Sequence, residues 1–543
     1  MRRRSRWQSE RNRPAANTGV TQNDTDQTSG EDPRARTPLP DWLDPLPDAA
    51  EQRSLDEWAI GQLRIPGIHL MERAGTGLAE LVQELAPAGR VVVVCGKGNN
   101  GGDGFVAARL LRDRGRDVQI LSLAPVDELR GDALANAERL PGAAPEPFRT
   151  DALAGAAAVV DAILGTGFSG EPRGPAASAI EAINAAADAA TVIACDVPSG
   201  VDASTGEIAG VAVTARATAT FNAAKPGLWI APGKGRAGQV RVVDIGIPAG
   251  GPAEPAVGLI GDGVTDGIPR RGRESTKFAA GSVLVCGGST GLTGAPSLAS
   301  EAAMRAGAGY VTAFVPSSLN AIFEVRLLEV MTVPLPDQAG SLEPEGEQQV
   351  LERSARADSL VLGPGLGRRD RAFALARNLA GAAGIPLLLD ADGLNAHAGA
   401  LSSLAQRSAA TVITPHAGEL ARLLETDSDS VSARRLHSAR RAAAAARAIV
   451  VLKGDDTIVA APDGSIGVSR GGAPALATAG SGDVLSGVIG AYLAKRVEPF
   501  HAACAGVFVH ACAGRLAAHA LGPEGVIARD VIEALPRALP TRV

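Results

Sequence analysis

The sequence predicts an α/β protein with two tandem three-layer domains, each a mainly parallel sheet covered by helices on both faces. Its 543 residues exceed what a single hydrophobic core usually organises. Short apolar runs alternate with amphipathic stretches over two separate spans of the chain, which is typical of βαβ units. A stretch rich in Gly, Pro and charge at 249–275 separates these spans, so we predict a linker or domain edge there.

The composition excludes several classes of protein. The formal charge of −6 and the isoelectric point near 5.8 provide no basic surface for nucleic acid. Charged residues interrupt every long apolar run, so we expect no membrane span. The five cysteines form no CxxC pair, which argues against a disulfide framework or a zinc site. We therefore expect a cytoplasmic protein.

Residues 1–45 are predicted to be a disordered, solvated tail. They begin with a basic segment and continue with a polar stretch rich in Thr, Asn, Asp and Pro. The tail has no apolar segment of the kind a secretory signal needs. Its acidic residues argue against a transit peptide, which is usually poor in acids: Asp24, Asp26, Glu31 and Asp32.

The first domain is predicted over 46–248. Amphipathic helical stretches occupy 51–63 and 68–85, and a further helix ends near Arg114. Apolar runs predict the strands of a parallel sheet; they are Val91–Val94, Val118–Leu123, Ala157–Val160, Val192–Ala194 and Val240–Val243.

Three of these strands end in glycines together with acids. The first leads into GNNGGDG with Asp103, the second into Asp161 and GTGFSG, and the third into Asp196 and PSGVD. A Gly-rich turn before a helix suits a phosphate, although Asp103 would repel one unless it serves another purpose. Open α/β sheets bind ligands at the carboxyl ends of strands, so the three junctions together predict a site.

These motifs, with IPGIHLMERAG before them, resemble the NAD(P)H-hydrate epimerase family, which implies a Rossmann-like domain. The resemblance implies that Asp196 acts beside the reacting ring and that Asn100, Asp161 and Ser199 bind K⁺. The chain departs from the family pattern at Arg73, where Asn is usual. Lys225, in FNAAKPGL, either supports the site or is a surface lysine. The implied contacts to the hydrated dinucleotide are Asn99, Asn100, Gly101, Gly102, Asp103, Gly165, Thr166, Gly167, Phe168, Ser169, Gly170, Glu171 and Asp196.

The second domain is predicted over 276–540. Helices are expected at 294–306, 416–425, 432–447, 482–494 and 501–518. Apolar runs again predict a parallel sheet; they are Ser282–Cys286, Tyr310–Val315, Ser359–Leu362, Pro386–Leu389, Thr411–Ile413 and Ile449–Leu452.

The segment ATAGSGDVLSGVIGAYLA at 477–494 is the sharpest local signal of this domain. Gly480 and Gly482 let backbone amides form an anion hole, and Asp483 places a carboxylate beside it. That pairing suits deprotonation of a hydroxyl that attacks a phosphoryl group. The alternative is an ordinary helix start capped by Asp483.

Four further motifs follow apolar strands: GPGLG at 363–367, LLLDADGLN at 387–395, TPHAGEL at 414–420 and VLKGDDT at 451–457. His416 would alone be read as a helix cap or a core residue, but at a strand end it is well placed for a ligand. Lys453 is a reasonable phosphate contact.

This set resembles the ribokinase-like fold and, more closely, the NAD(P)H-hydrate dehydratase family. The resemblance implies that Asp483 is the base and that Mg²⁺ neutralises charge. The chain departs from the family pattern at 275–278, where His-Lys-Gly is common. The implied hydrate contacts are Ala295, Gly367, His416 and Asp483. The implied ADP contacts and anion-hole residues are Lys453, Gly454, Asp455, Asp456, Thr457, Gly480, Ser481 and Gly482.

The resemblances imply a bifunctional enzyme that epimerises R- and S-NADHX and NADPHX and dehydrates the S form, converting ADP to AMP and phosphate. A homo-oligomer without nucleic-acid or membrane partners is expected, and the choice between ADP and ATP stays open. The alternatives are a small-molecule kinase of the same fold in the second half and a non-catalytic scaffold module in the first.

Overall fold

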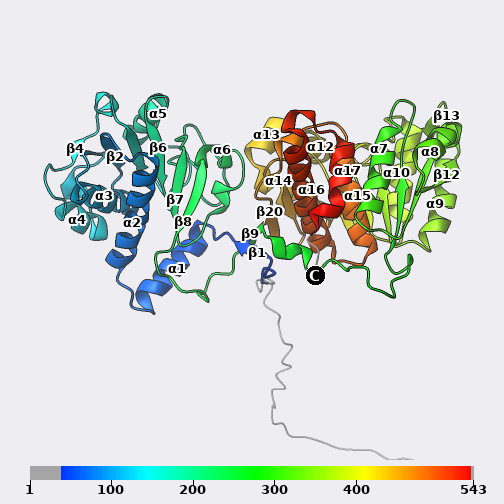
Figure 1. Cartoon of the computed structure of the whole chain (residues 1–543), viewed down its shortest axis with the longest axis horizontal. Coiled ribbons are helices and arrows are strands. Elements are labelled where there is room, and N and C mark those ends of the chain that lie inside the picture. Colours follow the sequence, from blue (N-terminus) through cyan, green and yellow to red (C-terminus); the bar gives the residue numbers. More distant parts are fainter. Residues whose placement is uncertain (1–37, 540–543) are drawn as a thin grey trace, which may run out of the picture. The chain divides into compact units, whose positions relative to one another are not determined.

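The computed structural model describes residues 38–539, and two α/β sheets organise them (Figure 1). Within this range the first sheet has seven strands, all paired in parallel, in the order β4-β3-β2-β5-β6-β7-β8. The strands are β2 (Val91–Cys95), β3 (Val118–Ser122), β4 (Glu146–Pro147), β5 (Ala158–Ala162), β6 (Thr191–Cys195), β7 (Ala217–Phe221) and β8 (Gln239–Val243). All five apolar runs expected in this span lie in strands. The strand β7 was not predicted, because its Ala and Thr residues form no apolar run.

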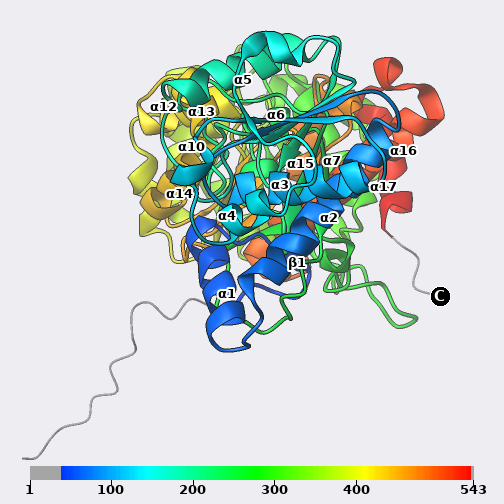
Figure 2. The same ribbon diagram turned by 90° about the vertical axis from the view of Figure 1, so that its left-hand side faces the viewer.

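Helices cover both faces of the first sheet (Figure 2). Val91, Val93 and Cys95 of β2 pack with the helices α2, α3 and α4, while Val92 and Val94 pack with α5. This alternation follows from the period of two in a strand and gives the expected three layers. The helices are α1 (Ala49–Gly61), α2 (Gly67–Leu85), α3 (Asn99–Asp113), α4 (Gly131–Glu138), α5 (Pro175–Ala186) and α6 (Lys234–Ala237).

The second sheet, counted over the same described range, has eleven strands in the order β1-β9-β20-β19-β18-β17-β16-β15-β10-β11-β12. Its parallel part contains all six predicted runs. The strands are β1 (Leu43–Pro45), β9 (Val257–Ile260), β10 (Ser282–Cys286), β11 (Tyr310–Pro316), β12 (Met331–Leu335), β15 (Ser359–Leu362), β16 (Leu387–Leu389), β17 (Thr411–Ile413), β18 (Ile449–Leu452), β19 (Ile458–Ala460) and β20 (Ile466–Val468). A separate small hairpin pairs β13 (Asp337–Gln338) with β14 (Ser341–Leu342).

Two segments expected to lie outside the domains contribute strands to the second sheet. Strand β1 comes from the predicted tail and pairs antiparallel with β9, which comes from the predicted linker. Strand β9 in turn pairs parallel with β20. Asp44 and Gly258 interrupt the apolar residues of these two short strands, so neither stands out as an apolar run. The predicted disorder of residues 1–37 lies outside the described residues.

Helices also cover both faces of the second sheet. Val283 and Val285 of β10 pack with α7, α15, α16 and α17, whereas Leu284 and Cys286 pack with α10, α12 and α14. The helices are α7 (Gly294–Arg305), α8 (Asn320–Arg326), α9 (Glu347–Ser354), α10 (Asp370–Ala382), α11 (Asp392–Asn395), α12 (Ala417–Leu424), α13 (Ser428–Ala433), α14 (Arg435–Ala446), α15 (Ser481–Ala494), α16 (Pro499–Leu521) and α17 (Ala528–Ala538).

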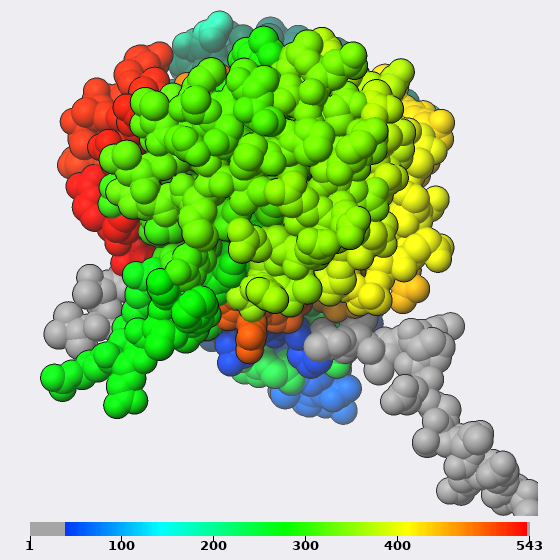
Figure 3. All heavy atoms as spheres, turned by 90° about the vertical axis from the view of Figure 1, so that its right-hand side faces the viewer, coloured from blue at the N-terminus to red at the C-terminus, as the bar shows by residue number. Residues whose placement is uncertain are grey.

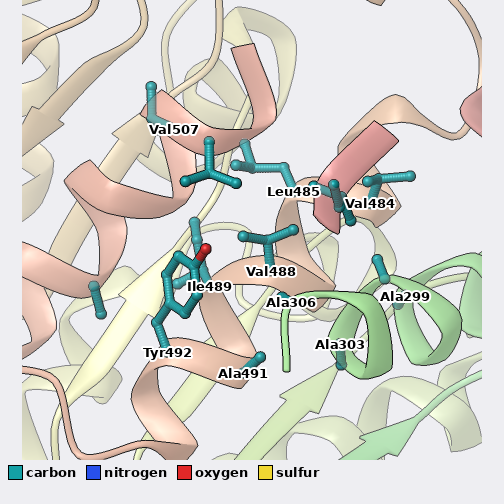
Figure 4. Packing of buried hydrophobic residues seen from close by; sticks show 14 of the residues in the cluster. Ala299, Ala303, Ala306, Val484, Leu485, Val488, Ile489, Ala491, Tyr492 and Val507 are labelled. Carbon is teal, nitrogen blue, oxygen red and sulfur yellow. The ribbon is translucent and has the colours of Figure 1, made fainter. Parts of the chain in front are cut away.

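The helix α15 packs within this core (Figure 4). Val484, Val488 and Tyr492 lie among the buried side chains of that cluster. A Cβ atom on Gly487 would lie 2.1 Å from the Ala299 carbonyl oxygen of α7, so the two helices approach as closely as they do only because residue 487 is glycine. This packing gives the first turn of α15, which carries Asp483, a fixed position.

One helix of the described part, α16, is long and apolar enough to cross a membrane by length and composition alone. Within this fold it packs against α15 and α17 and contributes Cys504 and Val509 to the core. Core packing therefore accounts for its apolar composition.

At the other end of the second sheet, β12 is an edge strand that packs against α8. Figure 3 shows the surface of the molecule on this side. Val325 and Leu328 are strongly exposed there. Pro334 lies within β12 and has no backbone N–H to donate to an added strand.

Candidate active sites

The first candidate site lies where the order of the first sheet reverses. Strand β2 has β3 on one side and β5 on the other, so the connections leave in opposite directions and open a crevice at the carboxyl ends. A cavity of about 840 Å³ occupies this place. The predicted contacts that line it are Asn99, Asn100, Asp103, Gly165, Thr166, Gly167, Phe168 and Asp196.

Five other predicted contacts lie outside the cavity lining. Gly101 and Gly102 are buried in the first turn of α3, where a Cβ atom would lie 2.0 Å from the Gly96 carbonyl oxygen and 2.6 Å from Met71 Sδ, respectively. These two glycines therefore shape the loop. Ser169, Gly170 and Glu171 are exposed.

Asp196 is the best-supported functional side chain of this site. Its Oδ1 accepts hydrogen bonds from Lys225 Nζ at 2.8 Å and Thr220 Oγ1 at 3.3 Å, and its Oδ2 accepts from Thr166 N at 2.9 Å. Its φ of 64° is in the left-handed region, where non-glycine residues concentrate at functional positions. Burial alone would raise the pKa of Asp196, but Lys225 and Thr166 outweigh burial and lower it. The carboxylate is therefore charged at neutral pH.

Lys225 is not a surface lysine. Only 1% of it is exposed, and its ammonium also donates to Thr220 Oγ1 at 3.0 Å and to the Phe221 carbonyl at 2.9 Å. With Asp196 as the third acceptor, all three ammonium hydrogens have partners. The structure therefore selects the interpretation in which Lys225 supports the site.

Two further carboxyl groups line the same cavity. Burial, followed by the charge of Asp196, raises the pKa of Asp103 well above its usual value. Burial also raises the pKa of Asp56, whose Oδ1 accepts a hydrogen bond from Gln52 Nε2 at 2.9 Å. Sequence reasoning missed Asp56 and Gln52, because α1 carries only an amphipathic pattern and no motif.

Of the three predicted K⁺ ligands, Asn100 lines this cavity, and Asp161 and Ser199 form a buried hydrogen-bonded pair. Ser199 Oγ donates to Asp161 Oδ1 at 2.6 Å, and Ser199 N donates to Asp161 Oδ2 at 2.8 Å. Burial raises the pKa of Asp161 to about 6. The buried amide oxygen and nitrogen of Asn100 have no hydrogen-bond partner. An unpartnered buried amide oxygen, a carboxylate and a hydroxyl are oxygen donors of the kind that a hard cation takes.

The second candidate site lies at the corresponding reversal of the second sheet, between β10 and β15. Here Gly288 N donates to the Pro364 carbonyl at 3.0 Å, and Ser289 Oγ donates to the Gly365 carbonyl at 2.9 Å. A Cβ atom on Gly365 would lie 3.3 Å from Ala295 Cβ, and one on Gly367 would lie 3.0 Å from Ser289 Oγ. The predicted contacts Ala295 and Gly367 are thus brought to one edge of the sheet.

Asp483 lies in the first turn of α15, as predicted. Gly480 precedes the helix with φ of 87°, and Ser481 Oγ donates back to the Leu476 carbonyl at 2.7 Å. Within the described residues, no hydrogen bond joins the Asp483 side chain to a backbone amide of α15, which argues against the helix-cap interpretation. Burial and the charge of Asp390 raise the pKa of Asp483 to about 7.

Lys453 lies between two carboxylates. Its Nζ donates to Asp390 Oδ1 at 3.0 Å and is 3.7 Å from Glu419 Oε2. Burial would lower the pKa of Lys453, but these two acids outweigh burial and raise it. The ammonium is also 3.5 Å from the position of a Cβ atom on Gly482, so it faces the first turn of α15. Asp390 and Glu419 occur within the motifs at 387–395 and 414–420, but the sequence assigned them no role.

His416 combines two of the expected interpretations. It caps α12, because its Nδ1 accepts from Gly418 N at 3.0 Å while Glu419 Oε2 accepts from His416 N at 2.9 Å. Its side chain remains 56% exposed, and burial of the remainder lowers its pKa. Nε2 lies 3.6 Å from Glu419 Oε1, so the exposed part of the ring keeps a polar atom beside the carboxyl ends of the strands.

The loop at 453–457, which is predicted to contact ADP, is held by internal hydrogen bonds. Thr457 Oγ1 donates to the Gly454 carbonyl at 2.6 Å. Asp456 is buried, and its Oδ2 accepts from Arg435 Nε at 2.8 Å. Asp456 therefore stabilises the loop through Arg435, while Asp455 is largely exposed.

Comparison with known proteins gives consistent results for both halves. Residues 67–227 match the family model described as YjeF-related protein N-terminus, and residues 283–537 match the one described as NAD(P)H-hydrate dehydratase. The chain is 40% identical over 91% of its length to the bifunctional NAD(P)H-hydrate repair enzyme Nnr of Moorella thermoacetica, covering 96% of that protein. It is 36% identical to the Nnr of Salinibacter ruber, over 92% of this chain and 96% of that one.

A solved structure resembles the second half. It is the ADP/ATP-dependent NAD(P)H-hydrate dehydratase of Bacillus subtilis co-crystallized with ATP/Mg²⁺, at 27% identity and a TM-score of 0.43. The match covers 51% of this chain and 94% of that one.

Proposed function

This chain belongs to the family of bifunctional NAD(P)H-hydrate repair enzymes, and on that premise we propose how its two sites divide the work. The first domain is an epimerase and the second a dehydratase. We assign interconversion of the R and S hydrates to the cavity around Asp196, and dehydration of the S hydrate to the site around Asp483. The observation that carries this assignment is that the two acids lie in different surroundings. Asp196 lines the cavity of the first sheet and pairs with Lys225, whereas Asp483 begins α15 and faces the Lys453 ammonium and two other acids.

Epimerisation needs a base and an acid at one cavity. The hydrate carries its hydroxyl on a carbon bonded to the ring nitrogen, so the centre inverts if that C–N bond opens and closes on the other face. Opening removes a proton from the hydroxyl and adds one to the ring, and closing reverses both transfers. Asp196, paired with Lys225, suits the first transfer, and Asp103, whose pKa is raised by burial, suits the second. Two carboxyl groups with divergent pKa values are a common basis for such a division.

Potassium fits the group formed by Asn100, Asp161 and Ser199. We propose that their oxygen atoms hold the ion, which would supply fixed positive charge beside the substrate. Ser199 Oγ accepts a hydrogen bond from Leu164 N at 2.9 Å, so this group is tied to the loop that contains Gly165 and Thr166. Thr166 donates to Asp196, and the loop thereby connects the proposed ion site to the catalytic carboxylate.

Dehydration needs activation of the ring hydroxyl. We propose that Asp483 accepts the hydroxyl proton as the oxygen attacks the terminal phosphorus of the nucleotide, which breaks the bond to its leaving oxygen. The backbone amides at 480–482 and the Lys453 ammonium face the charge that develops. The phosphate group then leaves the ring with its bonding electrons, and loss of a ring proton restores the dihydronicotinamide.

Mg²⁺ is expected to bind at this site together with the nucleotide. Among the described residues, no group of three or more His, Cys, Asp or Glu is arranged to hold a metal. Mg²⁺ in phosphoryl-transfer sites is bound largely by phosphate oxygens and water. When bound, it would offset phosphate charge, while His416, Ala295 and Gly367 contact the hydrate.

ADP is the donor we propose, and the products distinguish it from ATP and from kinase chemistry. Purified chain incubated with S-NADHX and ADP is expected to yield NADH, AMP and phosphate in equal amounts. Faster turnover with ATP would reverse the choice of donor. Accumulation of a stable phosphoester without NADH would instead support a kinase.

We also propose that the chain forms a homo-oligomer in the cytoplasm. The five cysteines are free and four of them are buried, which supports a reducing compartment. Light scattering of the purified chain tests the oligomeric state.

A further inference from the structure

Asp390 is a buried carboxylate to which the proposed reaction assigns no part. It follows β16 at the carboxyl edge of the sheet and is 2% exposed. Its Oδ1 accepts from Lys453 Nζ at 3.0 Å, and its Oδ2 accepts from Ser486 Oγ at 2.8 Å. A buried carboxylate is costly unless it is paired and hydrogen-bonded, so both of these contacts stabilise it.

These two contacts join the parts of the dehydratase site that do the chemistry. Lys453 follows β18, and Ser486 lies on α15 three residues after Asp483, which places the two on neighbouring positions of one helix face. The hydrogen bond to Ser486 therefore restrains the rotation of α15 about its axis. The ion pair holds the Lys453 ammonium toward Gly482 in the same turn.

We propose that Asp390 is a positioning residue of the dehydratase, which holds the Lys453 ammonium and the first turn of α15 in one arrangement. The ammonium and the Asp483 carboxylate then face the same reacting phosphoryl group. This inference rests on the proposed dehydration at Asp483 and extends it to a residue that acts through Lys453 and Ser486. Loss of such positioning lowers rates by roughly 10²-fold in comparable cases.

The charge of Asp390 should affect the pH profile of dehydration, which a purely structural residue would leave unchanged. The charged groups that face Asp483 are Asp390, Lys453 and Glu419. On the neighbouring α16, burial lowers the pKa of His510 to about 4, so His510 is neutral near pH 7. Removing the charge of Asp390 removes one of the two acids that favour the protonated form of Asp483. The acid limb of the pH profile should therefore move to lower pH.

Three variants of the full chain separate the charge of Asp390 from its hydrogen bonding. Asp390→Asn removes the charge, and Asp390→Glu keeps it. Ser486→Ala removes one hydrogen bond and keeps the charge. Dehydration of S-NADHX is measured from pH 5 to 9 with ADP, giving kcat and the KM for ADP. Epimerisation by the same preparations, at the other domain, serves as the control for protein quality.

We expect Asp390→Asn to lower kcat by about 10²-fold and to move the acid limb to lower pH, with epimerisation unchanged. Ser486→Ala is expected to lower kcat less and to leave the limb in place, and Asp390→Glu to restore the limb. If Asp390→Asn does not fold, the test passes to Asp390→Glu, which keeps the charge. An acid limb of its dehydration profile at the native pH supports the inference, and an acid limb at lower pH overturns it. Native kcat and profile in Asp390→Asn would also overturn it. Absence of dehydration in the native chain would instead refute the proposed function.

Discussion

Lys225 offers the strongest test of how the epimerase site is built, through the variant Lys225→Met. The substitution keeps a long apolar stem but removes the ammonium that donates to Asp196, Thr220 and Phe221. Asp196 is then left buried without its cation. Breaking a buried ion pair at one partner typically costs about 3–5 kcal/mol. For a domain of this size that corresponds to a melting temperature lower by roughly 6–20 °C.

The pH dependence of this loss follows from the pKa of Asp196. In the native chain, folding lowers the pKa of Asp196. Its contribution to the free energy of unfolding is therefore complete above the pKa that Asp196 has in the unfolded chain. This contribution is lost as the pH falls through the pKa of the folded chain. In Lys225→Met burial dominates and raises that pKa, so the variant loses stability as pH rises. The two proteins should therefore differ most near neutral pH and least in acid.

The assay compares thermal inactivation of epimerisation at pH 7 and in acid, with dehydration measured on the same samples. Lys277→Met is the matched control, because Lys277 is exposed and only contacts the faces of Phe278 and Tyr310; its cost should stay below about 1 kcal/mol. The double variant with Asp196→Asn should recover much of the stability, since no buried charge remains. Equal stability of Lys225→Met and the control at pH 7 would refute the reasoning.

Three further predictions concern the rest of the two sites. Dehydration by the native chain should rise with pH through about 7, because Asp483 must lose its proton to act as a base; a flat kcat/KM profile from pH 5.5 to 8.5 would contradict this. Asn100→Ala should abolish any stimulation of epimerisation by K⁺ over Na⁺ while leaving dehydration intact, and an unchanged K⁺ response would remove Asn100 from the ion site. Gly101→Ala should impair epimerisation by at least about tenfold, because its Cβ would lie 2.0 Å from the Gly96 carbonyl oxygen. Gly61→Ala is its control, since a Cβ there meets nothing within 4 Å and Gly61 lies outside the cavity lining; equal activities would contradict the steric argument.

The parallel strands were predictable because they are buried on both faces. Runs such as Val91–Val94 and Ile449–Leu452 contain only apolar residues, and burial of both faces requires this. The β7 strand escaped prediction because alternating Ala and Thr resembles a loop as much as a strand. The strands β1 and β9 escaped because their pairing partners are distant in sequence, and no local pattern reports such a partner.

The candidate sites were predictable where a motif follows a strand. Asp196 was selected in this way and lines the cavity at the reversal of the first sheet, whereas Asp483 was selected from a Gly-rich turn that precedes an apolar helix. The groups that set their charge were harder to find. Lys225 was left undecided, while Asp56 and Asp390 received no role, because a pKa depends on distances between segments that only the fold defines. His416 shows the converse, since one side chain both caps a helix and presents a nitrogen to the site.

The measurement that tests the central claim most directly is recovery of NADH from a mixture of R- and S-NADHX with ADP. The native chain is predicted to convert the whole mixture, because the first site replenishes the S form that the second consumes. Asp196→Asn should stop at the S fraction apart from slow spontaneous epimerisation, and Asp483→Asn should yield almost no NADH. Full and rapid recovery by Asp196→Asn, or recovery by Asp483→Asn, would contradict the assignment of the two reactions to these two sites.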